Sequence, residues 1–323
     1  MADNNSVVGG KSLMRVINYQ VILVQVLVAV FLCINFMLIT TFFMKDFFYK
    51  TMRYILFAVT LLSDCWILML SNILLICGYF QFTMQMWLCV VVYILSSLYL
   101  FVTPVTLTAM SLERYVAICM PLRHGELCTT RNTMHCILII HCISSLPCVV
   151  LLSIFFASAS ITFHTQYRVC SVEMFMLYRW QSHMYSAINQ FYFLIMCILI
   201  VFSYVEIIKV AKTASGENKK STWKGLRTVI LHGFQLLLCL IQLWCPFIEA
   251  AFLRIDFMSY VNVRYFNYII FYLGPKCLSP LIYGLRDGKF FLALKYYVLC
   301  GLYKNKALDL SLNYDCVTEI NEP

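Results

Sequence analysis

The segment MSLERYVAICMPLRH, residues 110–124, places an acid and a base side by side at the end of a long apolar run. Glu113 and Arg114 have the chemistry of an ion pair, and a pair that opens and closes is a switch. The alternative is a helix end that reaches water, where charged side chains are common. The choice depends on which element carries the two residues and on the surroundings of that element.

Three polar residues lie deep within apolar runs: Asn35, Asp64 and Ser279. An aspartate at the centre of a membrane helix costs about 2.5–3.5 kcal/mol on insertion scales, so it should face the interior of a bundle and find partners there. Asn35 and Ser279 are the available partners, together with water or a cation. These residues form a candidate polar core.

The composition indicates a membrane protein. The chain has 323 residues, of which 62% are hydrophobic and only 12% are charged, and its mean hydropathy is +0.82. A soluble domain is nearer a quarter charged, so too few polar side chains remain to cover a soluble surface. The net charge of +9 therefore does not imply nucleic acid binding.

Seven apolar runs reach the roughly 20 residues that a spanning helix needs. The expected spans are residues 20–44, 53–79, 86–119, 133–156, 187–212, 225–252 and 262–285. The turn between the last two spans is short and is expected at LRIDFMSYVNV, residues 253–263. The chain then divides into an N-terminal tail (1–19), an all-α bundle of seven transmembrane helices (20–285) and a C-terminal segment (286–323). Residues 287–299 are too short to span and predict an amphipathic helix on the cytoplasmic membrane surface.

Loop charges predict the orientation of the bundle. Lysines and arginines concentrate in residues 45–53, 120–132 and 206–227, and the alternate loops are nearly neutral. The positive-inside rule places the basic loops in the cytoplasm, the N-terminus outside and the C-terminus inside. Asn4 begins a glycosylation sequon on the expected outer tail.

Cys89 and Arg114 lie at opposite ends of the third span, roughly 37 Å apart at 1.5 Å per residue. The hydrocarbon core is about 30 Å thick, so Cys89 should sit at the outer face and Arg114 at the inner face. The second outer loop contains one cysteine, Cys170. Two cysteines on the oxidising side favour a disulfide between them, and the alternative is two free thiols.

MSLERYVAICMPLRH resembles the odorant-receptor form of the motif that ends helix three in rhodopsin-like G-protein-coupled receptors. Four further segments resemble helices two, five, six and seven of that family in the same order: MRYILFAVTLLSD (52–64), Ser203-Tyr204, KGLRTVILH (224–232) and PKCLSPLIYGLRD (275–287). The pattern is most similar to odorant receptors of fish. It departs from the wider family at Ser279, where asparagine usually precedes the proline, and in the absence of a tryptophan from the fourth span.

The resemblance implies a switch at the cytoplasmic end. Glu113 and Arg114 pair in the resting receptor, and Arg114 turns toward Tyr204 and the G protein in the active one. The residues implied in coupling are Glu113, Arg114, Tyr115, Tyr204, Lys224, His232 and Tyr283. The resemblance also implies an allosteric sodium ion near Asp64, with Asn35 and Ser279 beside it, and no other cofactor.

The resemblance further implies the partners and the location of the protein. An odorant shifts the bundle to a state that activates a stimulatory heterotrimeric G protein and raises cyclic AMP. Membrane lipid, an arrestin and a receptor kinase are the other implied partners. The implied location is the plasma membrane, in the cilia of olfactory sensory neurons.

The ligand pocket is expected in the outer half, between helices three, five, six and seven. Ser97, Phe101, Pro104 and Thr108 recur at i, i+4, i+7 and i+11, which places them on one face of the third span. The other expected lining residues are Asn189, Tyr192, Trp244, Phe247, Ala251 and Tyr272. For each residue alone, helix packing is the competing role. No clear carboxylate lies in this zone, which disfavours an amine receptor, and a mostly neutral aromatic cavity suits a small organic molecule.

Other classes of protein fit less well. The histidines at 135, 141, 183 and 232 are scattered, with no metal-ligand spacing or nucleophile motif, so an enzyme is not expected. No two-half repeat indicates a transporter. A receptor for another small molecule, a lipid or a peptide stays open. An opsin is the least favoured, because Leu273 stands where its retinal lysine would lie and Lys276 comes almost a turn later.

Overall fold

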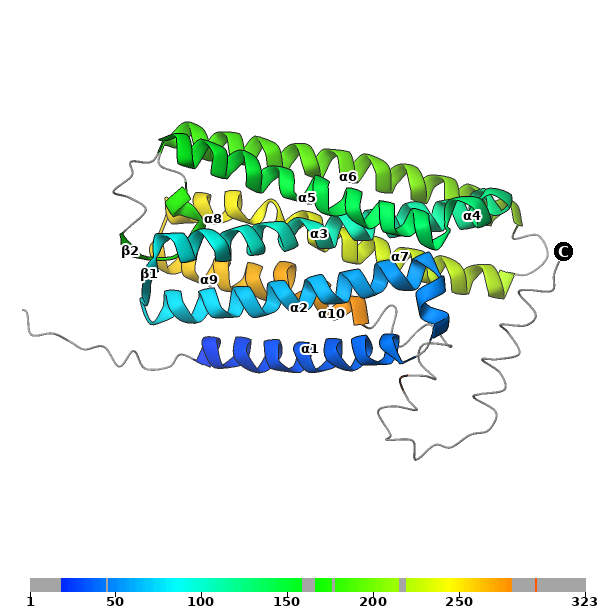
Figure 1. The fold of residues 1–323 in the computed structure, drawn as a ribbon, viewed down its shortest axis with the longest axis horizontal. Helices are drawn as coiled ribbons and strands as arrows, with labels where there is room; N and C mark the ends of the chain where they lie inside the picture. The colour runs from blue at the N-terminus through cyan, green and yellow to red at the C-terminus, as the bar shows by residue number, and fades with distance from the viewer. Residues whose placement is uncertain are drawn as a thin grey trace, which may run out of the picture.

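The computed structural model describes residues 19–44, 46–158, 166–175, 178–214 and 219–280, and residue 294. Long helices lie side by side along one common direction (Figure 1). Five of them are long and apolar enough to cross a membrane: α1 (Tyr19–Phe43), α2 (Met52–Tyr79), α3 (Met86–Cys119), α5 (Thr130–Ser158) and α6 (Arg179–Ala214). They correspond to the first five expected spans.

The sixth span consists of two helices, α7 (Lys219–Gln242) and α8 (Cys245–Leu253), which are bent by 41° at the break between them. Pro246 causes the break because it has no backbone N–H to donate to Gln242 and its ring clashes with that carbonyl. The backbone tightens instead, and the Trp244 N–H donates to the Ile241 carbonyl at 2.9 Å.

The seventh span is a continuous run of three elements: α9 (Phe257–Asn267), η4 (Tyr268–Leu273) and α10 (Gly274–Ser279). The middle element is π-helical, and the Gly274 N–H donates to the Ile269 carbonyl five residues back. Pro275 follows directly and cannot donate, which favours a wider turn at this point. At 1.5 Å per residue the run is roughly 35 Å long, enough to cross a membrane.

The remaining elements are short: η1 (Asp46–Lys50), β1 (Thr83–Gln85), α4 (Pro121–Leu127), β2 (Tyr167–Val169) and η3 (Val172–Phe175). The two strands pair antiparallel, with Met84 opposite Arg168. They lie at one end of the bundle, beside the start of α1, and α4 lies at the other end (Figure 1). The two ends are called the strand end and the α4 end below.

The predicted seven-helix bundle is confirmed, with corrections at four places. α7 begins at Lys219 and not at 225. α6 begins at Arg179 and not at 187. α9 begins at Phe257 and not at 262, because Asp256 caps it by accepting the Ser259 N–H at 2.9 Å. The helix α4 lies in a segment that was expected to be a loop. The predicted surface helix at 287–299 lies, apart from Leu294, outside the described residues.

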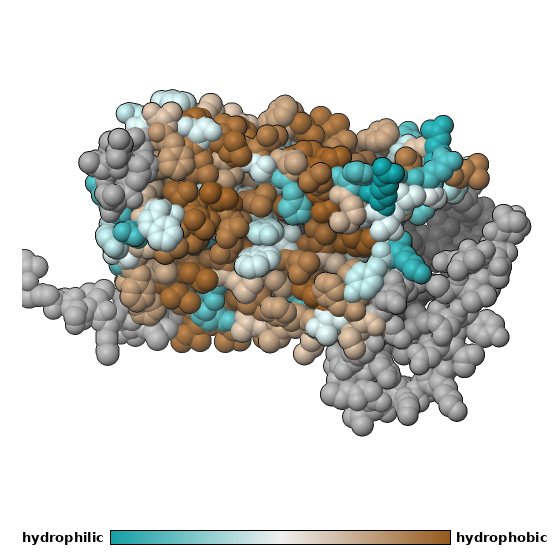
Figure 2. Space-filling model, viewed as in Figure 1, coloured by the Kyte–Doolittle hydropathy of each residue, from teal (hydrophilic) through white to brown (hydrophobic). Residues whose placement is uncertain are grey.

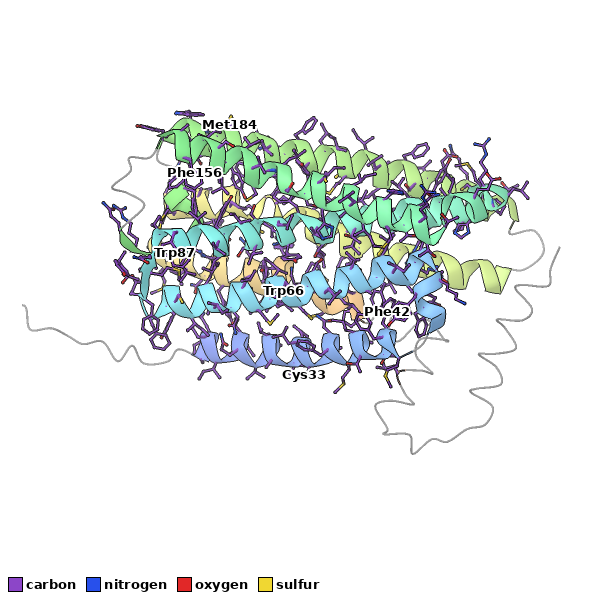
Figure 3. The ribbon with its side chains drawn as sticks, in the orientation of Figure 1. Cys33, Phe42, Trp66, Trp87, Phe156 and Met184 are labelled. Atoms are coloured by element: carbon purple, nitrogen blue, oxygen red, sulfur yellow. A yellow bond between two sulfur atoms is a disulfide. The ribbon has the colours of Figure 1, made fainter. Side chains whose placement is uncertain are left out.

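α3 runs through the middle of the bundle and packs against α2, α5, α6 and α7. Its central side chains Phe101, Leu107 and Met110 are buried. Figure 3 shows the side chains along the outer helices, such as α1, where Cys33 is exposed and Phe42 is buried. α1 therefore presents one face to its neighbours and another to the surroundings.

The outward faces of the helices are apolar. Leu138, Phe191 and Ile198 are about as exposed as side chains on a soluble surface, at 63%, 61% and 59%. Hydrophobic side chains cover most of the middle of the molecule, and hydrophilic ones gather chiefly near the α4 end (Figure 2). Such a belt is suited to lipid acyl chains.

Candidate functional site

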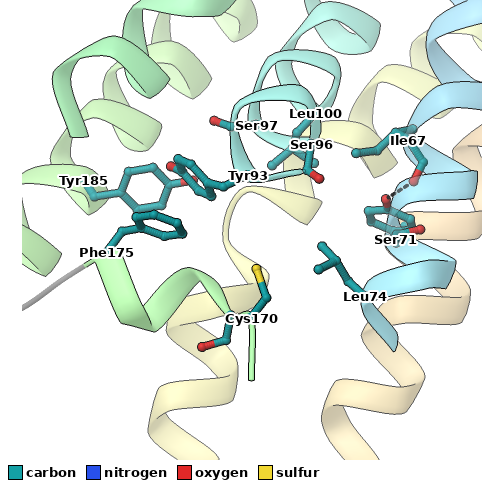
Figure 4. A pocket seen from close by; sticks show the side chains of 12 residues that line it. Ile67, Ser71, Leu74, Tyr93, Ser96, Ser97, Leu100, Cys170, Phe175 and Tyr185 are labelled. Atoms are coloured by element: carbon teal, nitrogen blue, oxygen red, sulfur yellow. Dashed lines mark hydrogen bonds between the residues drawn. The ribbon is translucent and has the colours of Figure 1, made fainter. Parts of the chain in front are cut away.

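A cavity of about 160 Å³ lies near the strand end, between α2, α3, α6, η4 and the segment that follows β2 (Figure 4). It is lined by Ile67, Ser71, Leu74, Tyr93, Ser96, Ser97, Leu100, Cys170, Ser171, Phe175, Tyr185 and Tyr272. None of these lining residues is charged. An apolar cavity of about 150 Å³ in another protein holds a benzene molecule, so this volume suits a small organic compound.

Aromatic rings and hydroxyl groups give the cavity its chemical character. Tyr93, Phe175 and Tyr185 gather on one side (Figure 4), where the rings of Tyr93 and Phe175 are 4.4 Å apart. Tyr272 closes the other side and donates its hydroxyl to the Ile67 carbonyl at 3.1 Å. The buried hydroxyls of Tyr93 and Ser97 have no hydrogen-bond partner among the described residues. A bound molecule with a polar group could satisfy them.

A disulfide joins Cys89 at the start of α3 to Cys170 after β2, with the Cα atoms 5.5 Å apart. This confirms the predicted pairing. Phe175 follows in η3, is fully buried and packs against Tyr93 and Phe155. The disulfide and this ring fix the segment that follows β2 over the cavity.

The polar core lies deeper in the bundle. Asp64 is fully buried and accepts hydrogen bonds from Thr103 Oγ1 at 3.0 Å and from Ser279 Oγ at 3.4 Å. Gln235 on α7 donates to Ser279 Oγ at 2.5 Å. Asn35 is also fully buried, but its amide has no hydrogen-bond partner among the described residues. Side chains of α3 and α10 therefore bond the carboxylate of α2 directly, and α7 joins them through Ser279.

Glu113 and Arg114 are both buried at the α4 end of α3, with only 8% and 4% of their surfaces exposed. Glu113 Oε1 lies 3.3 Å from Nε2 of His124 on α4. The thiol of Cys128, just beyond α4, has its pKa raised by burial and by the nearby charge of Glu113. Burial of this extent differs from a helix end that simply reaches water.

Tyr115 on α3 packs against α6, and Tyr204 on α6 packs against α7. The ring of Tyr115 lies 5.4 Å from that of Phe202 on α6. The ring of Tyr204 lies over Gly233 on α7, where a Cβ atom would be 3.0 Å from Cε2 of the tyrosine. The side chains of Lys224 and His232, together with Tyr283, lie outside the described residues.

Residues 18–283 match the family model described as 7 transmembrane receptor (rhodopsin family). The chain belongs to this receptor family. It is 42% identical over 257 residues to odorant receptor 131-2 of Danio rerio, which covers 79% of this chain and 78% of that protein. Galanin receptor 2a of the same organism is 24% identical over 249 residues, covering 71% of this chain and 64% of that one. The family consists of receptors and not of enzymes.

The receptor brings two of the predicted ligand residues, Ser97 and Tyr272, to the cavity. Phe101 lies one turn after Ser97 on α3. It is fully buried, and its ring packs against that of Tyr192, 5.3 Å away. Asn189 is buried, and Pro104 lies inside α3 within the bundle. None of these four side chains lines the cavity.

The predicted residues of the sixth span also lie outside the lining of this cavity. Trp244 is 42% exposed, and its ring lies 5.7 Å from that of Phe193 and 5.9 Å from that of Phe247. Ala251 is exposed. The structure therefore places the cavity closer to α2 and to the segment after β2 than the sequence interpretation did.

Tyr192 has a structural contact that sequence reasoning missed. Pro147 leaves the carbonyl of Ile143, four residues earlier in α5, without its helical donor. The Tyr192 hydroxyl donates to this carbonyl at 2.6 Å and thereby joins α6 to α5. The sequence contains both Tyr192 and Pro147, but it does not indicate that the Tyr192 hydroxyl lies next to the carbonyl that Pro147 leaves free.

A carboxylate was also missed. Glu249 on α8 accepts a hydrogen bond from Asn267 on α9 at 3.2 Å, and the sequence interpretation did not single it out. Glu249 does not line the cavity. Thr103 and Gln235, the other partners in the polar core, were missed because isolated threonines and glutamines are common in helices. Their position within apolar runs was the only signal.

Proposed function

We propose that this receptor is activated by a small, neutral, largely apolar odorant with one hydrogen-bonding group. The observation that supports this most directly is the cavity of about 160 Å³ near the strand end. Its uncharged lining disfavours ionic ligands, and the unpartnered hydroxyls of Tyr93 and Ser97 favour an alcohol, aldehyde, ketone or phenol. An unsatisfied buried hydroxyl costs about 1–3 kcal/mol, which such a ligand would recover.

Activation follows as a shift between two states of one bundle. An odorant moves the equilibrium only by its difference in affinity for the two states. The cavity and the Glu113–Arg114 region lie at opposite ends of α3, so the two sites are distinct and are coupled through the helices between them.

In this proposal the α4 end binds a stimulatory heterotrimeric G protein, and activation raises cyclic AMP. An arrestin and a receptor kinase would bind the same end.

The experiment is a screen of small alcohols, carbonyl compounds and phenols, with amino acids, bile acids and steroids as contrasting classes, read by cyclic AMP in transfected cells. Responses confined to amino acids or to large steroids would contradict the proposed ligand class. Incubating purified protein with retinal and recording absorbance tests the opsin alternative, and a visible band would favour it.

Replacing Ser97 with leucine should fill part of the cavity. For any compound found in the screen, we expect the concentration for half-maximal response to rise roughly tenfold or more, a cost of about 1.4 kcal/mol. The matched control is Ser153→Leu, because Ser153 is exposed on α5 and bonds only its own helix at 2.7 Å. Equal responses of the two variants at equal surface level would place the ligand elsewhere.

We also propose that the receptor lies in the plasma membrane of olfactory cilia with its N-terminus outside. The positive loops support this orientation. In transfected cells, glycosidase treatment should therefore increase the gel mobility of the wild type and leave that of Asn4→Gln unchanged. An antibody to a tag at the N-terminus should stain intact cells, and staining only after permeabilisation would reverse the orientation.

A further inference from the structure

Two pairs of opposite charges are buried in this receptor. Among the described residues, the buried acidic and basic side chains are Asp64, Glu113, Arg114 and Lys276. Glu113 and Arg114 are neighbours at the α4 end. Asp64 and Lys276 are the two that remain, and both lie within spans, where an uncompensated charge is costly.

Lys276 lies on α10 and is only 3% exposed. Its Nζ atom donates to the Tyr272 carbonyl at 3.1 Å and lies 4.1 Å from the centroid of the Tyr272 ring. A carbonyl oxygen and the face of an aromatic ring both attract an ammonium group. The lysine is therefore held inside the bundle and does not extend to water.

The ammonium group shares the polar core with Asp64. Ser279, which donates to Asp64 at 3.4 Å, follows Lys276 by about one turn on the same helix, an axial rise near 5 Å. Tyr272, whose carbonyl accepts from Lys276, donates its own hydroxyl to the carbonyl of Ile67, which lies about one turn after Asp64 on α2. Among the described salt bridges, no nitrogen–oxygen contact within 4 Å joins Lys276 to Asp64, so the two groups are not in direct contact.

A sodium ion does not fit this core. The amide nitrogen of Gln235 faces Ser279 Oγ at 2.5 Å and the Pro275 carbonyl at 3.2 Å, so two oxygens that a cation would need already accept hydrogen bonds. The ammonium of Lys276 would repel a second cation placed beside Asp64. Asp64 itself accepts from the hydroxyl groups of Thr103 and Ser279. The side-chain oxygens of Asn35 and Gln235 are buried without a hydrogen-bond partner among the described residues, so the charge of Lys276 is the main argument against a cation here.

We propose that Lys276 is the built-in counter-ion of Asp64 and that the polar core of this receptor takes no sodium ion. The tethered ammonium supplies the positive charge that a mobile cation would otherwise bring. Tyr272 contacts Lys276 and also lines the cavity, so the ligand site and the ion pair share one side chain. The proposal itself does not depend on which ligand the receptor binds.

The first test compares the melting temperature of purified wild-type receptor in sodium chloride and in N-methyl-D-glucamine chloride at equal ionic strength. We expect the same value in both salts. A higher melting temperature in sodium chloride would overturn the proposal, whatever any variant does, because it would show that the wild type binds the ion.

The second test is a double-mutant cycle on surface level. Lys276→Met and Asp64→Asn each leave one buried charge uncompensated, so each should lower surface expression several-fold. The double variant D64N/K276M should recover most of the loss. Lys209→Met is the control, since Lys209 is an exposed lysine paired with Glu206 at 2.6 Å. A double variant no better than K276M would refute the ion pair.

Discussion

Replacing Arg114 with alanine should abolish G-protein activation while the receptor still reaches the cell surface and binds its ligand. The side chain is 4% exposed near the α4 end of α3, whereas the α3 residues that line the cavity lie in the first half of that helix. Its loss removes a charge from the coupling region and leaves the ligand site unchanged. We expect the maximal cyclic AMP response to fall at least about tenfold, which corresponds to roughly 1.4 kcal/mol of stabilisation of the active state.

The matched control is Arg123→Ala, because Arg123 is an exposed arginine on the adjoining helix α4. Glu113→Gln should act in the opposite direction and raise cyclic AMP without ligand, since it neutralises the acid beside Arg114 and weakens its contact with His124. Two results together would contradict the proposed switch: normal signalling by Arg114→Ala at wild-type surface level, and unchanged basal activity of Glu113→Gln. Glu113 and Arg114 would then have a structural role only.

Replacing Cys89 or Cys170 with serine should remove most of the receptor from the cell surface. The disulfide closes a loop between residues 81 positions apart, and the chain-entropy model assigns such a loop about 4.5 kcal/mol. That value is an upper bound here, because membrane insertion already restrains the unfolded chain. Loss of the bond also frees the segment that places Phe175 against Tyr93 over the cavity.

Flow cytometry of a tagged receptor measures this effect. Cys33→Ser is the control, since Cys33 is a free, exposed cysteine on α1. The double variant C89S/C170S should behave like either single variant, because both singles lose the same bond. Normal surface level and ligand response in both single variants would show that the bond contributes nothing to the folded receptor.

The ends of the first spans could be read from the sequence, whereas the interruptions of the later ones could not. α3 begins and ends at the predicted residues because its apolar run is bounded by the polar Gln85 and by Pro121. The π-helical turn of η4 was not predicted, because a proline such as Pro275 can be accommodated in a helix by a kink, a break or a wider turn, and the sequence does not say which. The predicted start of α9 was too late because Asp256 was not identified in the sequence as the residue that caps this helix.

The candidate sites show the same division. Cys89 and Cys170 could be paired in advance because topology brings two cysteines to one side of the membrane. The polar core could be predicted as far as Asp64 and Ser279, but Gln235 and Lys276 needed the rotation of α7 and α10 about their axes. Helix rotation depends on packing at each interface, and a nearly uniform apolar sequence leaves it poorly specified.

The break between α7 and α8, where the two helices are bent by 41°, lies near Trp244 and is a point about which α7 could rotate as a rigid arm. The arm has 24 residues, about 36 Å at 1.5 Å per residue, so a rotation of about 10° would move its far end by roughly 6 Å. The residues of α7 within half a helical turn of Trp244 would move by less than about 1 Å. Small repacking around Trp244 and Phe193 would therefore be amplified at Lys219, where α7 begins.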